Sequence, residues 1–144
     1  MKLIISDGGR AAAGFNGTTG DCVTRAIAIA TGKPYQEVYD EINELAKGEK
    51  LTPKMRGSSS ARTGVHKKLQ RKYMSNLGWV YTPTMKIGSG CKVHLRADEL
   101  PSGRLIVQVS KHLVAVIDGI MHDTFDPSRD GTRCVYGYYK EEGR

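Results

Sequence analysis

The chain has 144 residues, of which 39% are hydrophobic and 26% are charged. This composition is ordinary for a single globular domain, and it excludes a disordered chain, a fibre and a disulfide scaffold. The formal net charge of +7 is concentrated in Lys47–Lys72, which holds nine basic residues and one acid, whereas the other residues carry 13 bases and 14 acids. We therefore expect one near-neutral domain over residues 1–144 with a basic insert at about 47–76.

The chain shows no targeting segment and no membrane span, because its apolar runs are too short for either. Three cysteines are present, Cys22, Cys91 and Cys134, and this odd number without a leader segment favours free thiols in a reducing compartment. The sequence therefore predicts a cytoplasmic protein with no membrane partner.

The first half of the chain predicts helices. A short strand at Lys2–Ser6 is followed by a glycine-rich irregular loop up to Gly20. A buried helix then begins at Cys22 and ends at Gly32, and a second runs from Pro34 to Gly48. Thr18, Thr19 and Asp21 are alternative N-caps of the first helix. Residues 49–64 predict a mobile polar loop, after which Thr63 can cap a third, basic helix that stops at Gly78.

From Trp79 onward the hydrophobic period is two, which predicts strands. The expected strands are Trp79–Thr82, Arg104–Val109, Lys111–Ile117, Ile120–Phe125 and Arg133–Tyr139. Asp118-Gly119 predicts a two-residue hairpin turn. Helices followed by strands indicate an α+β fold in which N-terminal helices, the first starting at the cysteine, pack on a C-terminal antiparallel sheet.

Cys22 is a candidate nucleophile because it begins a helix. The N-terminal end of a helix carries partial positive charge and unpaired N–H groups, and both favour a thiolate. The alternative is that Cys22 is a small buried apolar residue. Asp21 directly precedes the thiol and would oppose its ionisation unless it is turned away as a cap.

His112 is the candidate base. A two-residue turn at Asp118-Gly119 makes His112 and Asp123 diagonal neighbours on one face of the hairpin. A carboxylate there would hold the imidazole tautomer and stabilise its protonated form. If the turn has three residues instead, the parity changes and Asp126 becomes the better partner.

This order, with a cysteine opening the first helix, a histidine opening a strand and an acid on the next strand, resembles that of papain-like and C39-like cysteine peptidases. Asn16-Gly-Thr-Thr-Gly-Asp-Cys22 is similar to the papain-family run in which an oxyanion-hole amide precedes the nucleophile by six residues. Asp123-Thr-Phe125 is similar to the family's Asn-Ser-Trp. Residues 20–32 and 112–119 also resemble small phage and prophage proteins.

The resemblance implies a papain-like fold and a thiol-dependent hydrolase or acyltransferase, most simply a cysteine peptidase or amidase. In this interpretation Cys22 attacks a carbonyl carbon, His112 carries the proton, Asp123 orients His112, and Asn16 with the Cys22 N–H forms the oxyanion hole. No cofactor or metal is required. The substrate would be a protein or peptide-like amide, such as a host factor met in the bacterial cytoplasm during phage infection.

Three other readings compete. Lys47–Lys72 could bind nucleic acid, with Tyr73 and Trp79 stacking on bases. Cys91-Lys-Val-His94, together with Cys134 and His122, offers zinc ligands, although a second close-spaced pair is lacking. The chain could also be a non-catalytic phage-type binding or inhibitor protein that has the same fold.

Overall fold

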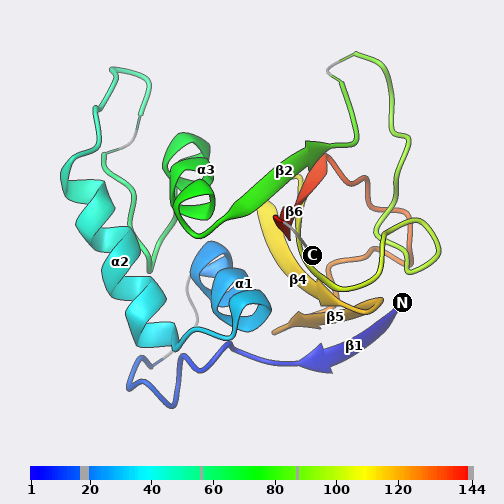
Figure 1. Cartoon of the computed structure of the whole chain (residues 1–144), viewed down its shortest axis with the longest axis horizontal. Coiled ribbons are helices and arrows are strands. Elements are labelled where there is room, and N and C mark those ends of the chain that lie inside the picture. The colour runs from blue at the N-terminus through cyan, green and yellow to red at the C-terminus, as the bar shows by residue number, and fades with distance from the viewer. Residues whose placement is uncertain (17–19, 56, 87, 143–144) are drawn as a thin grey trace.

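The computed structural model describes residues 1–16, 20–55, 57–86 and 88–142. Helices and strands in these residues build an α+β fold around one sheet, which confirms the expected class (Figure 1). The helices are α1 (Cys22–Thr31), α2 (Tyr35–Lys47) and α3 (Lys67–Asn76). The strands are β1 (Lys2–Ile5), β2 (Trp79–Pro83), β3 (Arg104–Val109), β4 (His112–Ile117), β5 (Ile120–Asp123) and β6 (Gly137–Glu141).

The sheet has the strand order β1-β5-β4-β3-β6-β2 and is mixed. Strand β1 pairs parallel with β5, so that Ile5 lies opposite Asp123, whereas all the other pairs of neighbouring strands are antiparallel. The expectation of a purely C-terminal, antiparallel sheet is therefore wrong at this edge. A strand of four residues carries no local signal for its partner, so the partner was not predictable from residues 2–5.

The hairpin between β4 and β5 has the expected register. Ala115 pairs with His122 and Val116 with Met121, so the turn has two residues. Asp118 and Gly119 both have positive φ, at 48° and 78°, as the turn type favoured in tight hairpins requires. His112 and Asp123 consequently lie at the open end of this hairpin.

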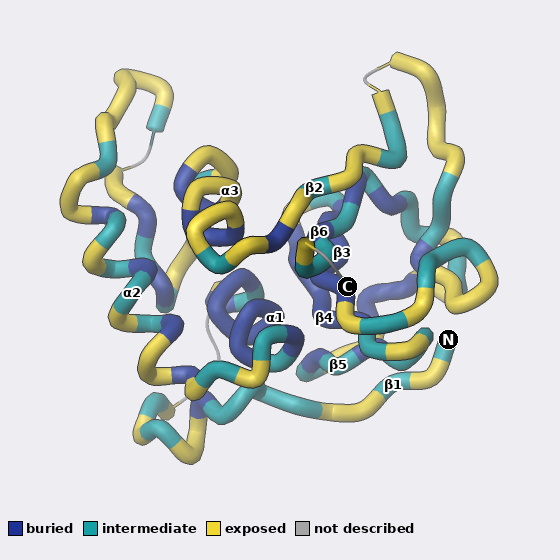
Figure 2. Tube along the Cα trace, in the orientation of Figure 1, coloured by how far each residue is buried: buried dark blue, intermediate teal, exposed yellow. Residues whose placement is uncertain are grey.

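Both faces of the sheet are covered. Helix α1 packs on one face against β4, where Ile27, Leu113 and Ala115 share a core, and α2 and α3 lie outside it (Figure 1). Figure 2 shows α1 buried along most of its length. The opposite face is covered by irregular segments that contribute Leu95 and Val135. Hydrophobic periodicity in the sequence does not predict this layer, because its residues follow neither a helical nor a strand pattern.

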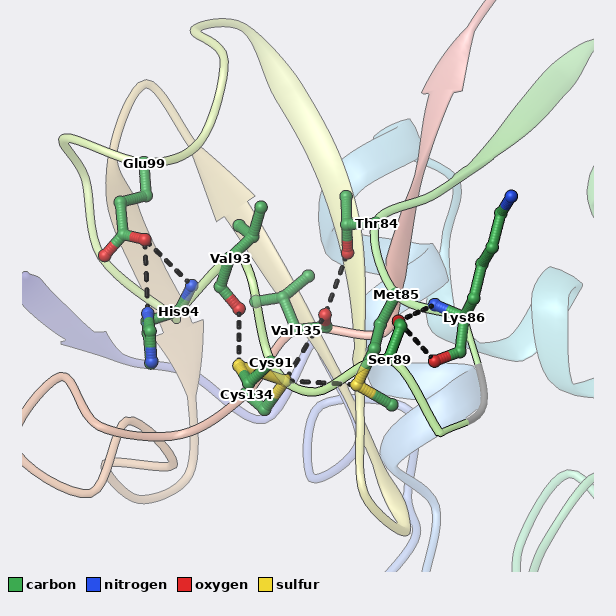
Figure 3. Close-up of a disulfide and its surroundings, with 10 residues drawn as sticks. All are labelled: Thr84, Met85, Lys86, Ser89, Cys91, Val93, His94, Glu99, Cys134 and Val135. Atoms are coloured by element: carbon green, nitrogen blue, oxygen red, sulfur yellow. Dashed lines mark hydrogen bonds and ion pairs between the residues drawn. A yellow bond between two sulfur atoms is a disulfide. The ribbon is translucent and has the colours of Figure 1, made fainter.

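Cys91 and Cys134 form a disulfide, so the expectation of three free thiols is wrong for these two (Figure 3). Backbone hydrogen bonds between Val93 and Val135 and between Leu95 and Arg133 hold the two segments side by side. Cys22 is the free cysteine.

The disulfide also argues against the hypothesis of a zinc site, because the two candidate sulfur ligands, Cys91 and Cys134, are bonded to each other. Within the described ranges, no three His, Cys, Asp or Glu side chains cluster closely enough to hold a metal ion. The same part of the chain contains no helix that is both long and apolar enough to cross a membrane.

The basic insert is anchored rather than mobile at its centre. The Glu49 carboxylate accepts hydrogen bonds from the Ser59 N–H and hydroxyl, at 2.6 and 2.7 Å, and Asn43 accepts one from the Ala61 N–H. Ser59 and Ala61 are both buried. Ser60 and Gly64 close a tight turn of their own.

Some boundaries differ from the expected ones. Helix α3 begins at Lys67 after His66 and is not capped by Thr63, because residues 60–64 form the turn described above. Strand β6 begins at Gly137, four residues later than expected. Asp21 occupies the N-cap position of α1 without a side-chain capping bond. The alternative caps Thr18 and Thr19, and Arg56 of the basic insert, lie outside the described residues.

Candidate active site

Three chain elements meet at the candidate site. Cys22 is the first residue of α1, His112 the first residue of β4 and Asp123 the last residue of β5. Because β4 and β5 run antiparallel, the start of one and the end of the other lie at the same end of the hairpin. Helix α1 packs against β4 and brings its N-terminus to this end.

Asp123 is the carboxylate that partners His112. His112 Nε2 lies 2.6 Å from Asp123 Oδ2, and both side chains are buried. Asp126, the other candidate, instead accepts hydrogen bonds from the N–H and hydroxyl of Ser128, at 2.8 and 2.7 Å. Asp126 therefore stabilises its own turn.

Cys22 and His112 form the second half of the constellation. Because Nε2 is held by Asp123, Nδ1 is the ring nitrogen left for the thiol. Burial raises the pKa of Cys22, but the hydrogen bond and positive charge of His112, the Leu113 N–H and Arg25 outweigh it, and the thiol pKa falls below its ordinary value. Burial lowers the pKa of His112, but Asp123 and Cys22 together raise it to about 9.

These two shifts favour a thiolate–imidazolium pair near neutral pH, because each charged group stabilises the other. Asp123 is the third member. Burial raises its pKa, but the hydrogen bond and charge of His112, the Thr124 N–H and Arg25 bring it below the ordinary range. The site therefore holds a stable carboxylate behind the imidazolium.

Asp21 does not oppose the thiolate as its position in the sequence suggested. Its carboxylate is buried and accepts hydrogen bonds from Arg10, at 2.9 Å, from Arg25, and from the Tyr35 hydroxyl, at 2.7 Å. Two guanidinium groups therefore neutralise the acid next to the nucleophile.

Arg25 connects this cluster to the candidate triad, and sequence reasoning missed it. Its Nη1 binds Asp21 and its Nη2 donates to Asp123 Oδ1 at 3.0 Å. The spacing of Asp21 and Arg25 on a helix, four residues apart, is the one local signal that could have indicated the first contact. The contact with Asp123 spans 98 residues and has no local signature.

Asn16, the expected oxyanion-hole amide, is exposed and does not line the cavity at Cys22. Its backbone carbonyl accepts a hydrogen bond from Arg62 at 2.8 Å. Residues 17–19, which connect Asn16 to the helix, are outside the described ranges. The first-turn N–H groups of α1, at Cys22 and Val23, have no partner within the helix and border the cavity, so they can donate to an oxyanion.

A cavity of about 560 Å³ opens beside Cys22 and His112. One wall comes from the basic insert, through Thr63, Gly64 and Val65. The insert is held there by the Thr24 hydroxyl of α1, which donates to the Ala61 carbonyl at 2.7 Å. The basic insert therefore flanks the candidate site.

Gln108 and Phe125 complete the surroundings of His112. The Gln108 amide donates to the carbonyls of Val109 and His112, at 2.8 and 3.1 Å, and it accepts a hydrogen bond from Gln70 of α3. These bonds hold the turn that leads into His112. The Phe125 ring centroid lies 5.1 Å from that of His112, which shields one side of the imidazole.

The aromatic residues expected to stack on nucleic acid are in the core. Tyr73 is 3% exposed and Trp79 is 6% exposed. Neither ring can receive a base, so the stacking half of the nucleic-acid reading is wrong.

Comparison with known proteins gave no match: no family model fits the chain, and no curated protein and no solved structure is significantly similar to it.

Proposed function

We propose that the protein is a thiol-dependent hydrolase or acyltransferase, of cysteine peptidase or amidase type, that uses Cys22, His112 and Asp123. The observation that carries this proposal is geometric: His112 is bonded to Asp123, and Cys22 and His112 line the same cavity. A buried thiol without a catalytic role needs neither a protonated histidine nor a cavity.

The chemistry follows from the charges. The Cys22 thiolate forms a bond to the carbonyl carbon of the substrate, and the carbonyl electron pair moves to oxygen, where the first-turn N–H groups of α1 stabilise it. The His112 imidazolium donates its proton to the leaving amine as the C–N bond breaks. Neutral His112 then takes a proton from water, or from an acceptor amine, which attacks the thioester and releases Cys22.

A papain-like arrangement is part of the same proposal. Its support is the cysteine at the start of a helix that packs on the strand carrying the histidine. The resemblance of residues 20–32 and 112–119 to phage proteins suggests a host protein as the target. The bacterial cytoplasm stays our prediction for the compartment, and the Cys91–Cys134 disulfide is the observation against it, because reducing compartments keep thiols reduced. Mass spectrometry of unreduced protein from those cells tests the prediction, and an intact disulfide there would contradict it.

The direct test is the rate of Cys22 alkylation by iodoacetamide as a function of pH. We expect a midpoint well below the ordinary thiol value of about 8.5, because the imidazolium stabilises the thiolate. His112→Ala should return the midpoint to that value, and Cys22→Ser should remove labelling. A wild-type midpoint near 8.5 would overturn the thiolate–imidazolium pair.

A non-catalytic binding or inhibitor protein is the second candidate. The observation in its favour is that Asn16 does not line the cavity. The variant Cys22→Ala distinguishes the two candidate functions. If the protein is catalytic, the variant should lose the biological effect of the wild type; if the protein only binds its target, the variant should retain that effect, because the cavity stays intact.

A further inference from the structure

A second cavity of about 440 Å³ adjoins the one at Cys22. Both cavities are lined by Lys67, Gln70 and Gln108, so they are neighbours that share these side chains, and we call the two together the trough. The trough runs from the N-terminus of α1 along α3 to Arg71 and Tyr81. The two cavities, of about 560 and 440 Å³, have more room than a single scissile amide needs, so they can hold neighbouring residues of a substrate.

Apart from the paired groups of Cys22, Arg25 and His112 at one end, the charged side chains of the trough are all cations. Lys67, Arg71 and Lys111 line it, and the described lining contains no Asp or Glu. All three side chains are on exposed residues, and within the described ranges none of them forms a salt bridge.

Other cations of this chain do find acids. Lys33 pairs with Glu37, Lys47 with Glu44, and Arg96 with Asp98. The acids of the chain are therefore able to pair with surface cations, but they are kept away from the trough. Unpaired cations around a concave surface raise the local concentration of anions.

We propose that the trough binds an acidic peptide segment, with a carboxylate side chain of the substrate held by Lys67 and Lys111 while an adjacent amide lies at Cys22. This inference rests on the proposed hydrolase or acyltransferase function and names its substrate class. Lys67 is central because it lines both cavities.

A peptide fits the trough better than a nucleic acid does. The aromatic rings there are already covered by cations: Arg71 lies 4.7 Å from the centroid of Tyr81, and Lys67 lies 6.0 Å from that of Tyr136. Single-stranded nucleic acids gain much of their affinity from stacking on open rings. A carboxylate needs only the cationic groups, and Lys67, Arg71 and Lys111 are all exposed.

The experiment uses two peptides of equal length that carry the same chloroacetamide group and differ at flanking positions as Glu or Gln. We expect the Glu peptide to label Cys22 about tenfold faster at low salt, and the advantage to shrink as salt rises. The double variant Lys67→Gln/Lys111→Gln should remove the advantage. The matched control Lys50→Gln/Lys54→Gln loses the same charge from exposed positions of the basic insert outside the trough, and it should keep the advantage.

Equal labelling by the two peptides, or equal loss in the control variant, would overturn the trough proposal. Failure of the proposed function is detected separately. In that case the pH midpoint of Cys22 alkylation by iodoacetamide, which is small and neutral, is that of an ordinary thiol, independently of the result with the peptides. Binding of inert versions of both peptides, followed by fluorescence anisotropy, then tests the trough alone. A single-stranded oligonucleotide that binds with the same dependence on Lys67 and Lys111, while the Glu peptide does not bind, would also overturn the proposal.

Discussion

At the scale of single residues, the proposed chemistry depends on what keeps His112 protonated. The ring is buried, which by itself lowers its pKa, and the carboxylate of Asp123 reverses that effect. The thiolate of Cys22 depends in turn on the imidazolium. Asp123 therefore contributes to the charge of His112 directly and to that of Cys22 through His112.

Asp123→Asn tests this dependence. The amide carries no charge, so the pKa of His112 should fall from about 9 by roughly one unit or more, and the alkaline limit of activity should move down with it. The acid limit should rise, because the thiolate loses its imidazolium partner. Titration of the His112 ring by NMR measures the first shift directly. Asp126→Asn is the control and should leave the ring unchanged, since Asp126 bonds to Ser128.

Arg25 carries a different prediction, because it neutralises two buried acids. Arg25→Met leaves Asp21 with Arg10 and Tyr35 alone and removes the Arg25 contact of Asp123. We expect the free energy of unfolding to fall by about 3–5 kcal/mol, as for other broken buried ion pairs. Urea denaturation measures this loss. Arg96→Met removes ion pairs with Asp98 and Glu99 from an exposed side chain and should cost about 1 kcal/mol or less; a loss equal to that of Arg25→Met would contradict this expectation.

Sequence patterns could predict that Cys22, His112 and Asp123 come together, but little of what surrounds them. The expectation for Cys22 came from helix-terminus chemistry, and that for Asp123 from hairpin parity, which are both local. Arg25 and Gln108 act through contacts made only after folding, and the position of Asn16 was inferred from family resemblance alone. Short-range patterns therefore predict which groups can react, whereas their charge states depend on the tertiary structure.

At the scale of elements, helix and strand positions follow from local signals, but their neighbours do not. Gly32 ends α1 in a left-handed conformation at φ 77°, and Gly119 turns the hairpin at φ 78°, both as their sequence context predicts. The order of strands in the sheet and the parallel pairing of β1 depend on contacts across the whole chain, for which single-sequence patterns contain no information.

These two glycines give a matched pair of substitutions. Gly32→Ala meets open space, so it should cost only the conformational strain of a positive φ, about 1 kcal/mol. Gly119→Ala carries the same strain and in addition places a methyl group 3.2 Å from the Ala97 side chain. We expect Gly119→Ala to lower the urea midpoint more. The reverse order would mean that Ala97 moves away without cost.

At the scale of the whole molecule, the layer of irregular segments on the second face is held to the sheet by a disulfide. Cys91 and Cys134 are 43 residues apart, and the apolar cluster beneath contains Leu95 and Val135. Strand patterns predicted the buried face of β4 but not the segments that cover it, because an irregular segment has no hydrophobic periodicity.

Reduction should therefore destabilise the protein without moving the site. Closing a loop of 43 residues contributes about 4 kcal/mol in the chain-entropy model, so the double variant Cys91→Ser/Cys134→Ser should unfold at a clearly lower urea concentration. Reductant should lower the midpoint of the wild type and leave that of the variant unchanged. The alkylation midpoint of Cys22 should be equal in both proteins, because neither Cys91 nor Cys134 lines the cavity at Cys22.

The parallel strand at the edge of the sheet also has a consequence for folding. Lys2–Ile5 pairs with residues 120–123, and the Ser6 N–H donates to the Asp123 carbonyl at 2.9 Å, next to the carboxylate that holds His112. Such non-local pairing forms slowly, because the entropy of closing a long loop is lost before any contact between the strands can stabilise it. On the ribosome, the first strand must wait until residues 120–123 have been synthesised. Under the proposed mechanism, we therefore expect Cys22 of the nascent protein to behave as an ordinary thiol until synthesis has passed Asp123.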